Sequence, residues 1–257
     1  MKTIFLLLVF VTISAKSQDV KKYFDEYDVK GSFVMYDMNS DKYFYYDSAR
    51  CNVGYSPAST SKIINALIGL ETGIIADENF VIPWDGVKRW LDAWNIDLDL
   101  KEAMRVSGVP YFQELARRVG YEKLNEMYKK LDYGNMDISG GVDQFWLSGA
   151  LRITQMQQID FLRRLYKEEL PVSKRSMDIV KSIIVLADTN SYVMRGKTGW
   201  SQSDTQNIGW LVGWVEKDGN VYFYAVNVES ALENKKFGES RRAITENILR
   251  DLGVLNR

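Results

Sequence analysis

The chain of 257 residues contains no histidine. This absence excludes a Ser-His-Asp triad, a cysteine–histidine pair and any metal site with histidine ligands. Acid–base chemistry must therefore come from lysine, tyrosine, aspartate or glutamate. Cysteine is almost as scarce, because Cys51 is the only one, and no disulfide can form within the chain. Without a histidine to activate it, the Cys51 thiol is a poor nucleophile, and we expect it to be structural.

The chain also lacks an excess of either charge. It has 33 basic and 34 acidic residues, with no long run of one sign. We therefore expect neither a nucleic acid nor an anionic lipid surface as a partner. The length allows one large domain, or two lobes that share an active site.

The only long apolar segment lies at the start, over residues 4–11. It is shorter than the roughly 20 residues that a membrane span needs. Lys2 precedes it and small residues ending in Ala15-Lys16-Ser17 follow it, which is the pattern of a secretory signal peptide. We expect residues 1–17 to be removed by cleavage after Ser17, giving a periplasmic or secreted protein with no membrane attachment. An uncleaved anchor is the alternative.

A serine and a lysine, Ser59 and Lys62, lie three residues apart immediately before an apolar run at helical spacing. Residues three apart share a face of a helix, so the hydroxyl and the amine should lie side by side. At a helix N-terminus the unpaired backbone N–H groups favour negative charge. The arrangement is that of an activated nucleophile. A solvated helix end with no function is the alternative if this motif is considered alone.

The remaining pattern predicts strands, then helices, then strands and a last helix. Strands are expected over residues 32–36, 42–46, 192–197, 208–215 and 221–228. Helices are expected over residues 111–119 and 239–252, and two more should begin after the capping box at Thr154 and after Ser173. In the helix after Ser173, Ala187 should be one of the residues that face the protein interior. We predict an α/β (α+β) fold in which one antiparallel sheet is built from both chain ends. Residues 18–75 and 190–257 would form an α/β lobe, residues 76–189 an inserted all-helical lobe, and the active site would lie between them within a single structural domain.

Lys197-Thr198-Gly199 lies at the end of the strand predicted over residues 192–197. An SxxK helix followed by KTG on a strand is typical of penicillin-recognising serine enzymes. The segments between the two motifs are more specific: Ser107-Gly108-Val109, Tyr133-Gly134-Asn135 and Gln144-Phe145-Trp146-Leu147, with residues 209–215 after them. Over essentially its whole mature length the chain resembles the class D (oxacillinase-type) β-lactamases. The Ser-Asp-Asn motif of class A enzymes is absent.

The resemblance implies a role for each of these residues. Ser59 would attack the β-lactam carbonyl, and Lys62, carboxylated by CO₂, would be the general base. Ser107 would relay a proton to the leaving nitrogen with support from Lys197. The other implied roles are an oxyanion hole from the backbone N–H groups of Ser59 and Trp200, carboxylate binding by Thr198, Gly199 and Arg241 (or Arg242), and a carbamate pocket of Val109, Trp146 and Leu147. No other cofactor and no metal are implied.

The chemistry of Lys62 is consistent with that role. Only a neutral amine reacts with CO₂, and a free lysine with a pKa of about 10.4 is almost fully charged at neutral pH. Burial in an apolar pocket disfavours the ammonium form and lowers the pKa. One position departs from the family: Ser61 stands where an aromatic residue is usual, and we expect it to make the lysine pocket wetter, weaken carbamate retention or widen the site.

The resemblance therefore predicts a β-lactamase that hydrolyses penicillins of the oxacillin type and confers β-lactam resistance. Its partners would be β-lactam small molecules, and the protein would be a monomer or a homodimer. The alternative is a β-lactam-sensing or penicillin-binding domain that is acylated without efficient turnover. Tyr133 and Asn135 are expected to be structural residues beside the site.

Overall fold

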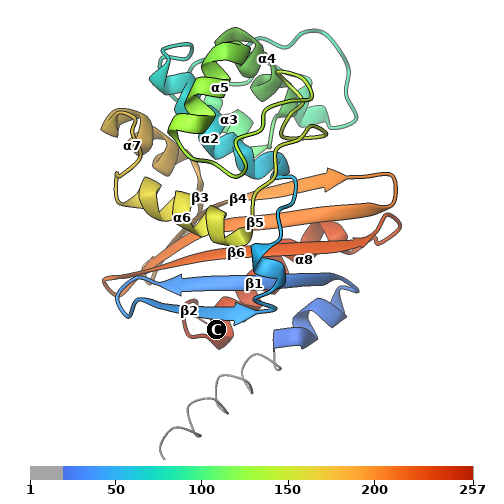
Figure 1. Cartoon of the computed structure of the whole chain (residues 1–257), viewed down its shortest axis with the longest axis vertical. Coiled ribbons are helices and arrows are strands. Elements are labelled where there is room, and N and C mark those ends of the chain that lie inside the picture. Colours follow the sequence, from blue (N-terminus) through green and yellow to red (C-terminus); the bar gives the residue numbers. More distant parts are fainter. Residues whose placement is uncertain (1–19, 257) are drawn as a thin grey trace, which may run out of the picture.

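A six-stranded antiparallel sheet forms the centre of the computed structural model, which describes residues 20–256 (Figure 1). The predicted signal peptide lies outside these residues. The strands are β1 (Lys30–Asp37), β2 (Lys42–Tyr46), β3 (Val185–Asp188), β4 (Val193–Gln202), β5 (Gln206–Lys217) and β6 (Asn220–Ala231). Their order across the sheet is β2-β1-β6-β5-β4-β3. Because β1 pairs with β6, the sheet joins both ends of the chain, as the sequence predicts.

Helices cover both faces of this sheet (Figure 1). They are α2 (Lys62–Glu71), α3 (Leu100–Arg105), α4 (Val109–Val119), α5 (Tyr121–Lys130), α6 (Gln155–Tyr166), α7 (Lys174–Ile183) and α8 (Phe237–Asp251), with short 3₁₀ helices η1 (Arg50–Asn52), η2 (Ala58–Ser61) and η3 (Asp92–Trp94). α8 packs on β5 and β6, on the face where the helical residues 20–26 also bury their apolar side chains. α6 packs on the opposite face, against β1, β5 and β6. Two apolar cores result, one on each face.

α2 is a buried helix that begins at Lys62 of the serine–lysine pair. Every residue from Lys62 to Leu70 is buried, and the helix packs against α4 and α7. A helix that is buried on all sides needs an apolar sequence all round, which the isoleucine- and leucine-rich run supplies. Its first residue is nevertheless a lysine, and that places a titratable amine inside the protein.

The predicted helix caps are present. Thr154 forms a capping box with Gln157 at the start of α6, and Ser173 accepts a hydrogen bond from the Ser176 N–H at the start of α7. The inward helical position predicted for Ala187 is wrong. α7 ends at Ile183, and residues 185–188 form the edge strand β3, which pairs with β4. α4 and α8 each begin two residues earlier than expected.

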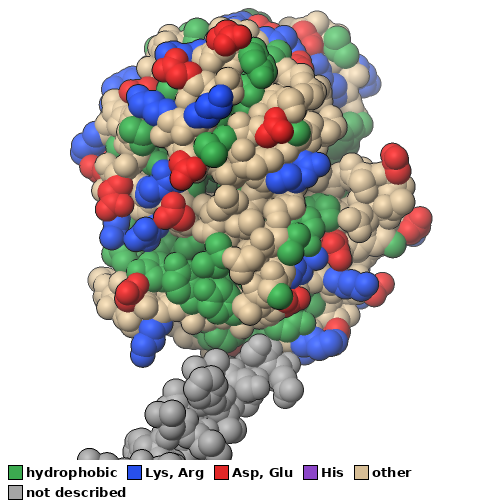
Figure 2. Space-filling view, in the orientation of Figure 1, with side chains coloured by type: hydrophobic (Ala, Val, Ile, Leu, Met, Phe, Trp, Pro, Cys, Tyr) green, Lys and Arg blue, Asp and Glu red, His purple; other side chains and the backbone are tan. Residues whose placement is uncertain are grey.

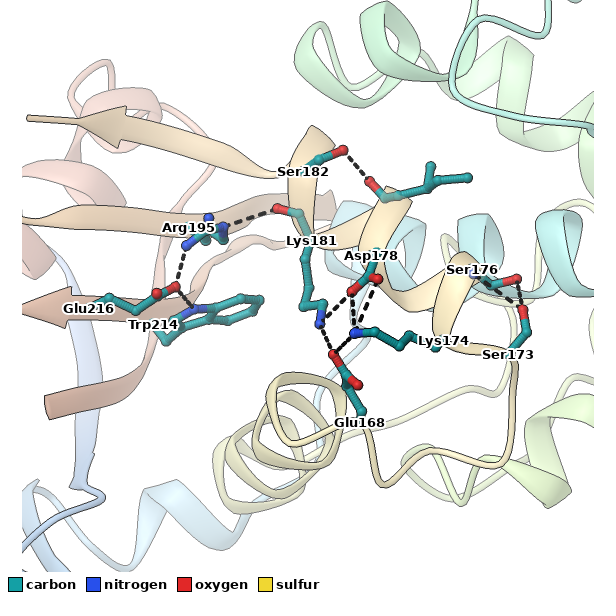
Figure 3. A network of polar contacts seen from close by, with 11 residues as sticks. Glu168, Ser173, Lys174, Ser176, Asp178, Lys181, Ser182, Arg195, Trp214 and Glu216 are labelled. Carbon is teal, nitrogen blue, oxygen red and sulfur yellow. Dashed lines mark hydrogen bonds and ion pairs between the residues drawn. The ribbon is translucent and has the colours of Figure 1, made fainter. Parts of the chain in front are cut away.

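A network of charged residues connects α7 to its neighbours (Figure 3). Lys181 Nζ lies 2.9 Å from a Glu168 carboxylate oxygen and 2.8 Å from one of Asp178. Arg195 on β4 donates from Nε to the Lys181 carbonyl at 3.1 Å and forms an ion pair with Glu216. Because partly exposed ion pairs contribute at most about 1 kcal/mol each, this network orients α7 more than it stabilises the fold.

Charged side chains of both signs are mixed over the face shown in Figure 2, in keeping with the formal net charge of −1. Among residues 20–256, no helix combines the length and the apolar character needed to cross a membrane.

Candidate active site

Ser59 lies in η2, directly before α2. Its neighbour Ala58 has a φ of 48°, an uncommon value for a residue with a side chain. The turn is closed by Thr60, which donates to the Pro57 carbonyl from its backbone N–H at 3.1 Å and from Oγ1 at 2.8 Å. The expected helical start is therefore a tighter 3₁₀ turn, in which side chains three residues apart eclipse one another. This turn directs Ser59 Oγ toward Lys62.

The Lys62 amine donates a hydrogen bond to Ser59 Oγ at 2.8 Å, so the predicted pair is formed. Lys62 is fully buried. Burial in the protein interior, followed by repulsion from the Lys197 charge, holds the pKa of Lys62 well below its usual range. The lowered pKa favours the neutral amine, which is the form that can act as a base or react with an electrophile.

Strand β4 brings the KTG motif to the edge of η2. Gly199 is required at this contact, because a Cβ at that position would lie 2.9 Å from the Pro57 carbonyl oxygen. Lys197 is buried, and its amine donates to the Thr198 carbonyl at 3.2 Å and to Thr198 Oγ1 at 3.3 Å. Burial, followed by the Arg241 charge, lowers the pKa of Lys197 to about 7.

Arg241 extends from α8 to the same end of β4. Its Nη1 donates to the Gly199 carbonyl at 2.8 Å and its Nη2 to the Gly238 carbonyl at 2.5 Å. The guanidinium lies 5.1 Å from the centre of the Trp200 ring and 5.9 Å from that of Phe237. Burial lowers the pKa of Arg241 to about 10, so the side chain stays positively charged at neutral pH.

The choice between Arg241 and Arg242 follows from this arrangement. Arg241 lines the cavity above Ser59, whereas Arg242 is exposed and pairs with Glu246 at 2.6 Å. Gly209 on β5 makes the space for Arg241, because a Cβ there would lie 2.7 Å from Arg241 Cδ.

A cavity of about 420 Å³ brings most of the predicted residues together. Its lining is Ser59, Trp90, Leu91, Trp94, Val106, Ser107, Val109, Leu147, Thr198, Gly199, Trp200, Gln202 and Arg241. Ser107 has a φ of 56°, a second uncommon backbone conformation beside the site. Such conformations cluster at functional sites, where the surrounding structure holds them in place.

Trp146 directly precedes the cavity-lining Leu147; it is buried, and its indole Nε1 has no hydrogen-bond partner among residues 20–256. Ser56 fixes its backbone, since the Ser56 hydroxyl lies 3.1 Å from the Trp146 carbonyl and 3.2 Å from that of Leu147. The Phe112 ring centre is 5.4 Å from Lys62 Nζ. A buried N–H donor without an acceptor is rare, and it suits an anionic group bound nearby.

Comparison with known proteins agrees with this geometry. A family model, the penicillin binding protein transpeptidase domain, matches residues 9–250. Beta-lactamase OXA-5 of Pseudomonas aeruginosa is 42% identical over 266 aligned positions, covering 99% of this chain and 99% of that protein. The crystal structure of the class D β-lactamase YbXI from Nostoc aligns with a TM-score of 0.88 and 42% identity, covering 92% of this chain and 99% of that one. The chain belongs to the class D β-lactamases.

This class D β-lactamase is also similar to the regulatory protein BlaR1 of Bacillus licheniformis. The two are 35% identical over 92% of this chain, which corresponds to only 39% of BlaR1.

Two other predicted features of the β-lactamase can be placed. Ser61 is fully buried and donates to the Ala58 carbonyl at 2.7 Å, so its hydroxyl is satisfied within its own turn. Cys51 is buried, and burial raises the pKa of its thiol to about 12, which agrees with a structural role. Within residues 20–256 no cluster of acidic residues and cysteine is suited to hold a metal ion.

The two residues expected beside the site have supporting contacts. Gln158 donates to Thr60 Oγ1 at 2.9 Å and to the Tyr133 hydroxyl at 3.4 Å, which links α6 to the nucleophile turn. Asn135 accepts from the Arg152 N–H at 3.0 Å and is not one of the residues that line the cavity.

Sequence reasoning missed one part of the cavity wall, formed by Trp90, Leu91, Trp94, Val106 and Gln202. A signal for it was available, because three tryptophans occur in the otherwise polar segment of residues 84–94. Trp94 is anchored through its Nε1, which donates to the Val106 carbonyl at 3.0 Å, and its ring lies 5.4 Å from that of Trp90.

Proposed function

We propose that this class D β-lactamase hydrolyses the β-lactam amide of penicillins through an acyl-enzyme on Ser59, with carboxylated Lys62 as general base. The observation that carries the proposal is the fully buried Lys62 amine, 2.8 Å from Ser59 Oγ, in a chain without histidine. Burial lowers the pKa of this amine and so favours the neutral form, which is the form that reacts with CO₂.

Carboxylation forms a bond between Lys62 Nζ and the carbon of CO₂ and releases one proton to solvent. The product supplies a carboxylate base beside the serine, which a histidine-free site otherwise lacks. The surroundings fit such an anion, because the unpartnered Nε1 of Trp146 can donate to it. Val109 and Leu147 line the adjoining cavity and would keep the modified lysine away from water.

In the acylation step, Ser59 Oγ loses its proton to the base and forms a bond with the β-lactam carbonyl carbon. The backbone N–H groups of Ser59 and Trp200 would stabilise the oxyanion. The ring C–N bond then breaks, and the nitrogen receives a proton through Ser107 with support from Lys197. A water molecule, deprotonated by the same base, releases the penicilloate and restores the serine.

The cavity has a polar end and an apolar end, and this division suggests how a penicillin would lie. Thr198 and the Arg241 guanidinium stand at the β4 end, suited to a carboxylate. Another part of the lining contains Trp90, which is 82% exposed, together with Leu91 and Trp94. An exposed tryptophan at a cavity mouth offers a ring face to an aromatic acyl side chain, as in oxacillin-type penicillins.

We expect Trp90→Ala to weaken the use of penicillins with bulky aromatic side chains. Loss of one ring contact, about 0.5–1.5 kcal/mol, predicts a rise in KM for oxacillin of about two- to tenfold. The KM for 6-aminopenicillanic acid, which has no acyl side chain, should stay unchanged. Trp84→Ala is the matched control, because Trp84 is a half-exposed tryptophan of the same segment that lies outside the cavity. Equal effects of the two variants on oxacillin would contradict the assignment.

Bicarbonate should activate the enzyme if Lys62 is carboxylated. In buffer stripped of CO₂, nitrocefin hydrolysis should be slow, and added bicarbonate should restore it. Protonation of the Lys62 amine competes with carboxylation, so the dissolved CO₂ needed for half-activation should rise as pH falls through the lowered pKa of Lys62. A ¹³C-bicarbonate NMR titration should give a carbamate signal that Lys62→Ala removes.

Mass spectrometry of the penicillin-treated protein separates hydrolysis from the second candidate function, β-lactam sensing. The similarity to BlaR1 is the observation that favours sensing. A transient adduct with accumulating hydrolysed drug supports the enzyme. A stable adduct without turnover at saturating bicarbonate would instead support a sensing or penicillin-binding role.

The proposed site of action is the periplasm or the exterior of the cell. The support is the basic start, short apolar run and small-residue junction of residues 1–17. N-terminal sequencing of the exported protein should begin at Gln18.

A further inference from the structure

Asn65 is a polar residue in the otherwise apolar interior of α2. Its side chain is only 3% exposed, and its neighbours on the helix are isoleucine, alanine and leucine. Asn65 Oδ1 accepts a hydrogen bond from the Tyr128 hydroxyl at 2.8 Å, whereas Nδ2 has no partner in the part of the chain that the structure describes. An amide nitrogen carries two donor hydrogens, and buried donors in native structures are nearly always satisfied.

The position of Asn65 places this free amide next to the reactive lysine. Asn65 follows Lys62 by three residues, and residues at that spacing share a helix face. Side chains in a helix lean toward its N-terminus, so the Asn65 amide lies over the turn that contains Lys62. The hydrogen bond from Tyr128 fixes which end of the amide carries the oxygen and leaves the nitrogen unoccupied.

A second free donor belongs to the same cluster. The Tyr128 ring packs edge-on against Phe145 at 5.1 Å, and Phe145 packs edge-on against Trp146 at 4.8 Å. Trp146 Nε1 is also buried without a partner. Within residues 20–256 only four buried side-chain polar atoms lack a partner, and two of them are the donors of Asn65 and Trp146, which Tyr128 and Phe145 connect.

We propose that Asn65 is a positioning residue for CO₂ capture, whose amide nitrogen stabilises the carboxylated form of Lys62 together with Trp146. Tyr128 holds the amide in the orientation that presents its donor hydrogens. This inference rests on the proposed carboxylation of Lys62. A second donor beside that of Trp146 would raise the affinity for the anion without entering the reaction with the β-lactam.

The test measures CO₂ affinity by ¹³C-bicarbonate NMR, independently of turnover. Asn65→Leu removes the donor while keeping the branched side-chain shape, and we expect the CO₂ dissociation constant to rise about tenfold, as for the loss of one charge-assisted hydrogen bond. Saturating bicarbonate should restore most of kcat, because the residue acts through Lys62. Tyr128→Phe should also raise the CO₂ dissociation constant, but by less than Asn65→Leu. Without the Tyr128 hydroxyl the Asn65 amide can rotate, yet its donor is still present.

Gln155→Leu is the matched control. Gln155 is an equally buried amide, but its Nε2 donates to the Ser32 carbonyl at 3.1 Å and the Ala225 carbonyl at 2.7 Å, away from the site. Its loss should lower Tm and leave the CO₂ dissociation constant unchanged.

An unchanged dissociation constant in Asn65→Leu would overturn the inference while leaving carboxylation intact. If that variant does not fold, an unchanged constant in Tyr128→Phe has the same meaning. Absence of a carbamate signal in the unmodified protein would instead overturn the proposed function, so the two failures are distinguishable.

Discussion

Ser59→Ala should abolish penicillin hydrolysis and prevent formation of any covalent penicillin adduct. Ser59 Oγ is the only hydroxyl within hydrogen-bonding distance of the buried Lys62 amine among the described side-chain contacts. Removal of a nucleophile that works together with its base lowers kcat by up to about a millionfold in other serine hydrolases. Nitrocefin turnover and mass spectrometry after penicillin treatment measure the two effects separately.

Ser61→Ala is the control for this experiment. Ser61 is a buried serine of the same turn, but its hydroxyl contacts only the Ala58 carbonyl. We expect its removal to change kcat by less than about tenfold, the effect of losing one ordinary hydrogen bond. Turnover that survives in Ser59→Ala would contradict the acyl-enzyme mechanism, whatever Ser61→Ala does.

Lys62→Met should have opposite effects on activity and stability. Loss of the general base lowers kcat by about 10²–10⁴-fold, and a slowly released penicillin adduct should accumulate. Stability should increase, because a lysine with a lowered pKa in the fold favours the unfolded state at every pH below its unfolded pKa of 10.5. In a chain of this length, a gain of 1 kcal/mol corresponds to about 2–4 °C in Tm.

The stability gain should fade as the pH rises toward 10.5, where the unfolded lysine also loses its proton. Thermal unfolding of both proteins between pH 7 and 10.5 measures this trend. Lys167→Met, at an exposed position after α6, should leave activity and Tm nearly unchanged. A fall in Tm for Lys62→Met at pH 7 would mean that the lysine contributes to stability rather than costing it.

Much of the fold could be predicted because its signals are local. The capping residues Thr154 and Ser173, and the strands over residues 208–215 and 221–228, follow from short-range patterns that the structure confirms. Strand β3 could not be predicted in this way. Residues 185–188 continue the helical spacing of α7, and only the pairing with β4 makes them a strand.

The site shows the same division between local and long-range information. The spacing of Ser59 and Lys62 predicts their contact, because it depends on one turn. The choice of Arg241 over Arg242 depends on Gly209, a residue on another strand that leaves room for the side chain. The unpaired amide nitrogen of Asn65 could not be predicted from the sequence either. Whether a buried amide finds a hydrogen-bond acceptor depends on residues that are distant in the chain.

The pairing of β1 with β6 has a consequence for how the chain folds. These two neighbouring strands come from near opposite ends of the chain, with Phe33 opposite Val226. A loop that closes over most of the molecule is entropically costly and forms slowly. During synthesis β1 has no strand to pair with on that side until residues 220–231 exist. A chain shortened before β6 would contain Ser59, Lys62 and the whole KTG motif and still be unable to assemble them into a site.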